Sequence, residues 1–201
     1  MKIQQKIGYH HGNLKETLID VAIQEIKERG TINLSLRQLA QKCGVSQSAP
    51  YRHFRDKQHL IAVITGHGYK LLTEMAEKVQ TESDLPEVRL RKICLTYVQF
   101  AMKNNALFNL MTGPDSFNKN KYPDLLKSAD ECFSRLIKTL ASLTGKPQTL
   151  REDDTFALLT YAVIHGVTIL LVNGQIRRAK TKKEQEKIAL DVIDAFIKQV
   201  K

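Results

Sequence analysis

The stretch L-S-L-R-Q-L-A-Q-K-C-G-V-S-Q-S-A-P-Y-R-H-F-R-D-K-Q-H-L, residues 34–60, holds two short helical patterns that are separated by a glycine. Ser35 is a candidate N-cap residue for the first helix, and Gly44 is placed to end it. The apolar positions of this first helix recur at i, i+3, i+4 and i+7: Leu36, Leu39, Ala40 and Cys43. Two short helices joined by a Gly turn, the second polar and basic, predict a helix-turn-helix.

The second helix of this motif is predicted to begin at Ser46, although Pro50 lies inside it. With Ser46 as N-cap, Pro50 is the fourth helical residue, where at most one intrahelical hydrogen bond is lost. Val45 and Phe54 are expected to anchor the helix in the core. The side chains between them are expected to face outward and to reach base edges or phosphates of DNA: Gln47, Ser48, Ala49, Tyr51, Arg52 and His53. Lys57, in the next helix, adds an expected phosphate contact.

Apolar residues recur at helical spacing along nearly the whole chain, and no segment alternates for long with a period of two. We therefore predict an all-α protein, with a three-helix domain at the N-terminus and a helical bundle at the C-terminus. The predicted helices cover residues 13–29, 35–43, a segment from 46, 56–79, 86–104, 106–111, 123–143, roughly 151–173, and 182–200.

The chain is basic, with 31 Lys and Arg against 21 Asp and Glu and a formal net charge of +10. Residues 1–60 contain 10 basic and 5 acidic side chains, so half of the excess lies in less than a third of the chain. A concentration of cations favours an anionic partner such as nucleic acid. The charge distribution therefore agrees with DNA binding by the N-terminal part.

Three cysteines, Cys43, Cys94 and Cys132, are an odd number at wide spacing, and no stretch has the pattern of a secretory signal peptide. We expect reduced thiols in a cytoplasmic protein. The uncharged run F-A-L-L-T-Y-A-V-I-H-G-V-T-I-L-L-V, residues 156–172, is short for a membrane span, which needs about 20 apolar residues. We expect it to be a helix that is buried between two subunits.

Motifs of enzymes and of metal sites are absent from the sequence. It contains no Gly-rich phosphate loop, no G-x-S-x-G elbow and no pair of histidines at i and i+4 with a carboxylate partner. The acidic residues Glu152, Asp153 and Asp154 precede a predicted helix, where negative charge is stabilised by the helix dipole. We therefore predict neither catalysis nor a metal ion nor a cofactor.

The quoted residues 34–60 resemble the DNA-binding signature of the TetR/AcrR family of bacterial transcriptional regulators. G-Y-H-H-G-N-L, residues 8–14, resembles the start of one subgroup, and T-Y-A-V-I-H-G-V-T-I-L-L-V-N-G, residues 160–174, is similar to the motif of its WHG-type C-terminal domain, with Tyr161 in place of tryptophan. The resemblance implies a DNA-binding domain over 1–58, an effector-binding and dimerisation domain over 59–201, and a homodimer on an operator. By the same resemblance, Arg37 joins the expected DNA contacts.

The resemblance also implies which helices hold the effector and the dimer interface. The large or polar residues on the helices that are expected to surround an effector are Tyr97, Phe100, Phe108, Met111, Phe117, Phe133 and His165, with core packing as the alternative for each. The expected interface residues are Ala162, Gly166, Ile169, Ile193 and Phe196.

Gly66 and Gly68 are either a bending point between the domains or sites of tight packing.

Two functions of different kinds remain open at this point. The first is a repressor that a small-molecule effector releases from its operator. The second is a DNA-binding organiser or division regulator with the same helix-turn-helix and no effector. A closed, mostly apolar cavity in the C-terminal domain would favour the first, and a filled core would favour the second. A third kind, a helical carrier or enzyme, would lack salt-dependent DNA binding.

Overall fold

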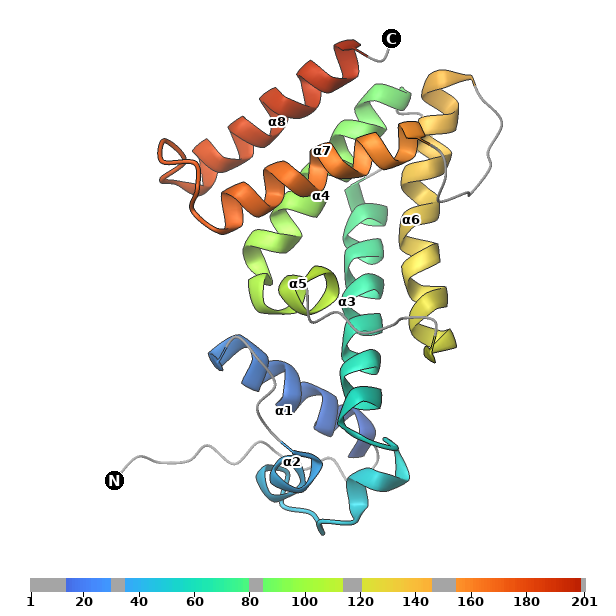
Figure 1. Ribbon diagram of the computed structural model, residues 1–201, viewed down its shortest axis with the longest axis vertical. Coiled ribbons are helices and arrows are strands. Elements are labelled where there is room, and N and C mark those ends of the chain that lie inside the picture. Colours follow the sequence, from blue (N-terminus) through green and yellow to red (C-terminus); the bar gives the residue numbers. More distant parts are fainter. Residues whose placement is uncertain (1–13, 30–34, 80–84, 114–120, 146–154, 200–201) are drawn as a thin grey trace.

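The computed structural model describes residues 14–29, 35–79, 85–113, 121–145 and 155–199, and in these ranges the protein is helical without strands. Its elements are α1 (Leu14–Arg29), α2 (Leu36–Lys42), the 3₁₀ helix η1 (Ala49–Arg52), α3 (Lys57–Val79), α4 (Pro86–Lys103), α5 (Asn105–Thr112), α6 (Pro123–Thr144), α7 (Thr155–Val172) and α8 (Lys182–Gln199). The prediction of an all-α fold is confirmed. Figure 1 shows α1, α2 and η1 at one end of the molecule and α4 to α8 in the other part, with α3 running between them.

Side-chain caps and a left-handed glycine fix the helix ends of the N-terminal domain. Ser35 and Gln38 form a reciprocal capping box at the start of α2. Gly44 has a φ of +68°, a conformation that residues with a Cβ adopt at a cost, and it turns the chain after α2. Asp56 Oδ1 accepts a hydrogen bond of 2.7 Å from the His59 N–H in the first turn of α3. These caps confirm the positions that the sequence predicts for Ser35, Gly44 and Asp56.

The predicted start of the second motif helix at Ser46 is wrong, because regular structure there is limited to η1, a single 3₁₀ turn. Ser46 and Ser48 belong to a preceding turn, in which Ala49 N–H donates to the Ser46 carbonyl at 3.0 Å. Pro50 is therefore in the first turn of η1, where an N–H group has no helical partner to lose. The carbonyl of Pro50 still accepts from the His53 and Phe54 N–H groups, so the proline costs the segment little.

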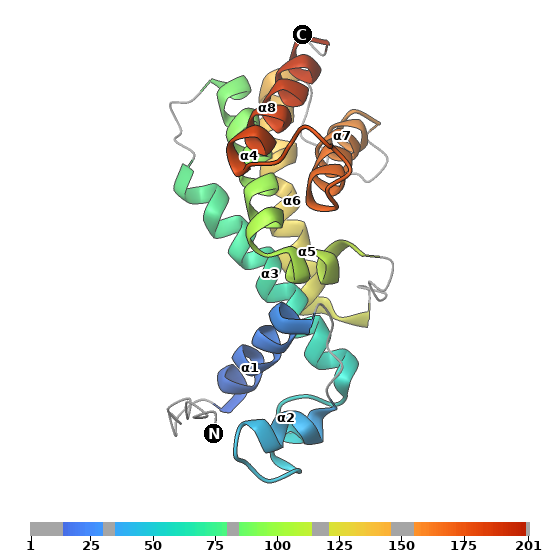
Figure 2. The same cartoon turned by 90° about the vertical axis from the view of Figure 1, so that its left-hand side faces the viewer.

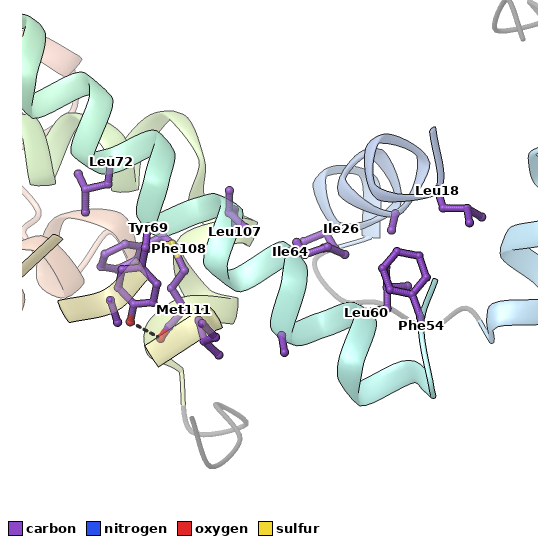
Figure 3. Close-up of a cluster of buried hydrophobic side chains, with 14 of the residues drawn as sticks. Leu18, Ile26, Phe54, Leu60, Ile64, Tyr69, Leu72, Leu107, Phe108 and Met111 are labelled. Atoms are coloured by element: carbon purple, nitrogen blue, oxygen red, sulfur yellow. Dashed lines mark hydrogen bonds between the residues drawn. The ribbon is translucent and has the colours of Figure 1, made fainter. Parts of the chain in front are cut away.

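The three-helix domain is built around apolar residues that include Leu18, Ile26, Leu39 and Phe54, all 0–1% exposed, and these residues belong to a buried cluster that continues along α3 to α5. Figure 3 shows Leu18 and Ile26 of α1 beside Phe54 and beside Leu60 of α3. Each such side chain contributes about 1.5–3 kcal/mol by its burial. The core therefore holds α1, α2, η1 and the start of α3 together as one unit.

Helix α3 belongs to this unit and to the C-terminal body at the same time. Its first turns place Leu60 and Ile64 in the core of the N-terminal domain, and its later turns place Tyr69 and Leu72 beside α5 (Figure 3). It packs along α6 and also contacts α4 and α5. The predicted boundary between residues 58 and 59 falls in the first turn of α3, which continues without a break, and it stays a prediction.

Helix α4 is the centre of the body, and it contacts α3, α5, α6, α7 and α8. One cluster of buried residues joins Leu90 and Cys94 of α4 to Leu136 of α6, Ile164 of α7 and Ile193 of α8. A second cluster joins Val98 of α4 to Val167 of α7 and Ala189 of α8. Figure 2 shows α7 and α8 in the half of the molecule away from α2.

Helix α7 is apolar on its inner and its outer side. Its buried threonines satisfy their hydroxyl groups within the helix, as Thr160 donates to the Phe156 carbonyl at 2.8 Å and Thr168 donates to the Ile164 carbonyl at 2.7 Å. The inner side can therefore pack against α4 and α8 without an unpaired polar group there. A helix that is hydrophobic on all sides is stable in water when both sides are covered.

The two glycines in α3 have different surroundings. A Cβ on Gly66 would meet atoms of Leu125 and Ser128 at 3.8 Å, which is ordinary contact. A Cβ on Gly68 would lie 2.5 Å from Met111 Sδ and 3.2 Å from Leu107 Cγ. Gly68 is therefore a site of close packing between α3 and α5, which is the second of the two interpretations that the sequence leaves open.

We expect Gly68→Ala to lower the free energy of unfolding by about 1–3 kcal/mol, because the buried Met111 must move. Gly66→Ala serves as the matched control, and we expect it to be neutral or to stabilise by up to about 1 kcal/mol through helix propensity. Urea denaturation of the two single variants measures the difference. Equal effects of the two substitutions would contradict the packing role of Gly68.

Candidate functional site

The residues predicted to contact DNA lie on one short segment and on the exposed side of α2. Pro50 and Phe54 are buried and hold η1 against the core, so the residues between them face solvent. The side chain of Tyr51 is 50% exposed, although it is large and partly apolar. Of the predicted residues, the exposed ones are Arg37, Gln47, Ser48, Tyr51 and Arg52, and the half-buried ones are Ala49, His53 and Lys57. Their contact with DNA stays a prediction.

The chain after Gly44 is held in place by packing as well as by its turn. Val45 is half-buried against the domain core, and its N–H donates to the Ala40 carbonyl at 3.0 Å. The His53 ring packs edge-on against Phe54, with ring centroids 6.3 Å apart. Tyr51 and Arg52 therefore project from a rigid base, which suits a surface that has to match the groove of a duplex.

The body contains a mostly apolar, partly open cavity of about 60 Å³ that is lined by five helices. Helix α3 contributes Tyr69, Leu72, Thr73 and Ala76, which follow the i, i+3, i+4, i+7 spacing of one helix face. The remaining lining residues come from α4, α5, α6 and α7: Ile93, Cys94, Tyr97, Met111, Thr112, Cys132, Phe133, Arg135, Leu136, Tyr161 and Ile164.

The predicted effector residues fall into three groups. Tyr97, Met111 and Phe133 line the cavity. Phe100 and Phe108 do not line the cavity, because both are 0% exposed and packed in the core, which is the alternative given for each, and their contact with an effector stays a prediction. Phe117 lies outside the described residues. Sequence reasoning missed the α3 face, although its helical spacing from Tyr69 to Ala76 is visible in the sequence.

His165 contacts two residues that line the cavity, Tyr97 and Tyr161. Its Nδ1 lies 2.9 Å from the Tyr97 hydroxyl oxygen at hydrogen-bonding distance, and its ring stacks on Tyr161 at 5.3 Å. Burial lowers the pKa of His165, so the imidazole stays neutral at physiological pH. This arrangement is that of a hydrogen-bonded core histidine, the alternative to ligand contact, because Tyr97 and Tyr161 line the cavity and His165 does not. Direct contact of His165 with an effector stays a prediction.

The ionisable groups of the cavity are held in their neutral or paired forms. Burial, followed by the nearby Tyr161 hydroxyl, raises the pKa of Tyr97, and burial raises the pKa of the Cys94 thiol. Arg135 forms an ion pair with Glu77 of α3. The cavity therefore presents hydroxyl groups, aromatic rings and aliphatic side chains, with its one cation already neutralised among the described lining residues.

Helix α7 carries a second exposed feature, an apolar face. Leu158 is 59% exposed, and Leu158, Ala162, Gly166 and Leu170 follow one another at intervals of four residues on the same side of the helix. Leu159 is exposed beside them. The predicted interface residues Ala162 and Gly166 thus lie on this α7 face, which also includes Leu158, Leu159 and Leu170, three residues that the sequence prediction left out.

The other predicted interface residues are placed differently. Ile193 is 1% exposed in the core of its own protomer, between α4, α7 and α8, and its role in an interface stays a prediction. Phe196 is half-buried and stacks on Phe156 with ring centroids 6.0 Å apart. Ile169 is half-buried and packs toward the core. Helix periodicity in α8 identifies its apolar stripe but does not say whether that stripe meets α4 or a partner.

Among the described helices, α7 also has the length and the mean hydropathy, 2.0, of a membrane span. Its inner side packs on α4 and α8, and 28% of its residues are buried within the protomer.

The described part of the chain contains no group of three His, Cys, Asp or Glu side chains that would hold a metal ion.

We expect Arg52→Ala to weaken operator binding about tenfold or more, and Tyr51→Phe to weaken it less, because each removes one contact from the exposed segment. Arg178→Ala, which changes an exposed arginine on the α7–α8 connection, is the control. Fluorescence anisotropy with a labelled operator measures affinity, and size-exclusion chromatography checks that the oligomer is intact. Wild-type affinity in both variants of the exposed segment would rule out this surface.

Comparison with known proteins identifies the family of each part of the chain. Residues 18–64 match the family model "Bacterial regulatory proteins, tetR family", and residues 90–196 match "Tetracyclin repressor-like, C-terminal domain". The second match covers more than half of the chain. The WHG-type subgroup predicted from residues 160–174 is compatible with it and stays a prediction.

Solved structures show the same fold. A protein of unknown function from Rhodococcus sp. RHA1 is 27% identical, with 96% of this chain and 98% of that chain covered and a TM-score of 0.76. The TetR family transcriptional regulator PfmR from Thermus thermophilus is 23% identical, with 90% and 97% covered and a TM-score of 0.60. The fatty acid degradation regulator FadR from Bacillus halodurans is 15% identical, with 94% and 97% covered and a TM-score of 0.67. The chain therefore belongs to the TetR family and is a DNA-binding transcriptional regulator.

Proposed function

We propose that this regulator is a cytoplasmic, homodimeric repressor that leaves a near-palindromic operator when a small molecule fills the cavity in its body. A two-fold dimer presents two recognition segments, so it favours two half-sites about one helical turn apart. A ligand shifts such a protein away from DNA only if it binds better to the form in which that spacing is wrong.

The observation that carries this proposal is the double role of α3. The same helix supplies Leu60 and Ile64 to the core of the DNA-binding domain and Tyr69, Leu72 and Ala76 to the cavity or its edge. Its 23 residues form one unbroken helix of about 35 Å. A side-chain movement that makes room for a ligand is therefore communicated along α3 to the base of η1.

Helix α7 supports the proposal from the other side of the cavity. Tyr161 and Ile164 face the cavity, while Leu158, Ala162, Gly166 and Leu170 face outward. An exposed apolar face of this kind favours association with a second copy, because burial of it removes apolar surface from water. A ligand between α3 and α7 would then act on the angle between each DNA-binding domain and the dimer interface.

The second function, an organiser without an effector, predicts a filled core in the body. The body instead contains a mostly apolar cavity lined by α3 to α7, partly open rather than closed, and this unfilled space supports the effector-responsive repressor. Selection of genomic fragments by the purified protein across a salt series tests the DNA side of the proposal. Enrichment of one short palindrome, with affinity falling steeply as salt rises, supports a site-specific dimeric regulator, and binding without sequence preference supports the organiser.

We expect Ala76→Met to imitate an occupied cavity, because a longer side chain at this buried lining position fills the space between α3 and α6. Operator affinity should fall about fivefold to a hundredfold, the range of allosteric coupling energies. Ala141→Met, at a half-buried position of α6 away from the cavity lining, is the matched control. Anisotropy titrations compare the two variants, and thermal melting shows whether each is folded. Equal affinities would contradict coupling between cavity and operator.

A further inference from the structure

We propose that the effector of this regulator is a neutral molecule with a single aromatic ring that carries a hydroxyl or carbonyl group. The inference rests on the proposed function, because it concerns the same cavity and assigns the chemical class of its ligand. Four properties of the cavity lead to it, namely its size, its ring-lined walls, its lack of an available charge and its hydroxyl groups.

The size of the cavity limits the ligand. Its volume is about 60 Å³, and an engineered apolar cavity of about 150 Å³ is known to hold benzene. A single ring therefore fits once half-buried side chains such as Phe133 rotate outward. A fused or extended ligand would need displacement of the helices themselves, whose buried residues are close-packed.

Aromatic rings form much of the wall. Phe133 and Tyr161 meet edge to face with centroids 5.1 Å apart, and Tyr97 and Tyr161 do so at 6.5 Å. Aromatic pairs prefer such offset or edge-to-face arrangements at separations of about 4.5–7 Å. A flat ring in the cavity can make the same contacts with Phe133, Tyr97 and Tyr161 that these rings make with one another.

The charges of the cavity favour a neutral ligand. No carboxylate is among the described lining residues, so a cationic ligand would lack a counter-ion there. The one charged lining residue, Arg135, is already paired with Glu77. The side chains of this pair are 36% and 49% exposed, so an anionic ligand would compete with Glu77 for Arg135 at the edge of the cavity. A neutral ligand avoids both this competition and the desolvation of a charge.

The hydroxyl groups of the cavity favour a ligand with an oxygen substituent. The Tyr97 hydroxyl is fixed at 2.9 Å from His165 Nδ1, and the Tyr69 hydroxyl donates to the Met111 carbonyl at 3.4 Å (Figure 3). A phenolic group can donate one hydrogen bond and accept others. Tyr97, whose hydroxyl is oriented by His165, is therefore the residue that we assign to recognition of the ligand's polar group.

Four probes of similar size test the class: p-cresol, toluene, benzoate and benzylamine, the last of which is cationic at neutral pH. Calorimetric titration of the purified full-length protein measures their affinities, and operator release is measured in parallel by anisotropy. We expect p-cresol to bind best, toluene about fivefold more weakly because it lacks one hydrogen bond, and the two charged probes more weakly still.

A pair of variants tests the assignment of Tyr97. Tyr97→Phe should reduce the affinity for p-cresol to that for toluene and leave toluene binding unchanged. Tyr122→Phe, which removes a hydroxyl outside the cavity lining, should change neither. If Tyr97→Phe does not fold, Tyr69→Phe provides the same comparison at the second hydroxyl, and there the p-cresol preference should shrink.

The outcomes separate this inference from the proposed function. Binding of benzoate or benzylamine as tight as that of p-cresol, or no binding by any probe, overturns the ligand class. Equal affinity of p-cresol for wild-type protein and both tyrosine variants overturns the recognition by hydroxyl groups. If p-cresol binds as expected but the operator is not released, the ligand class is supported and the proposed release mechanism fails.

Discussion

Helix α3 has to pack against the N-terminal helices and against the body with one continuous backbone, and the rest of the molecule is arranged around that constraint. Leu60 and Ile64 lie toward α1, Tyr69 and Leu72 lie in the body, and all four belong to one connected cluster of buried residues. Gly68 lets α3 approach Met111 of α5 more closely than any residue with a side chain would allow. Because α3 is packed along its length in this cluster, a shift of α3 in the body requires a response among the N-terminal helices. This packing gives a rigid connection between a site for DNA and a cavity in the body.

The two sites have opposite electrostatic character. The DNA-binding part concentrates positive charge, with a net +5 over residues 1–60, and it leaves Arg37 and Arg52 in solvent. The cavity, in contrast, keeps Tyr97 and Cys94 protonated through burial and pairs Arg135 with Glu77. Long-range attraction to a polyanion suits the first site, and selection by shape and hydrogen bonding suits the second. In the proposed function, a ligand in the cavity would act on DNA binding without competing for the same surface.

Local features of the fold could be predicted from the sequence, because they depend on residues that are close together in the chain. Helical periodicity predicted the all-α architecture, and Ser35, Gly44 and Asp56 predicted the ends of the motif helices through capping and a left-handed turn. The same reasoning placed the start of the second motif helix too early, since the spacing of apolar residues does not distinguish an α-helix from the single 3₁₀ turn Ala49–Arg52. Exposure of Tyr51 and Arg52 followed from their position beside the buried Pro50 and Phe54.

The surroundings of each apolar helix face depend on the tertiary structure. Phe100, Phe108 and Ile193 have the helical spacing that is expected of lining or interface residues, yet all three are buried within the protomer. Helix α4, which carries Phe100, is surrounded by five other helices. Tyr69 and Tyr161, separated by more than 90 positions, meet at one cavity. Periodicity identifies the face of a helix that avoids water. The crossing of the helices decides whether that face meets the core, a cavity or another molecule.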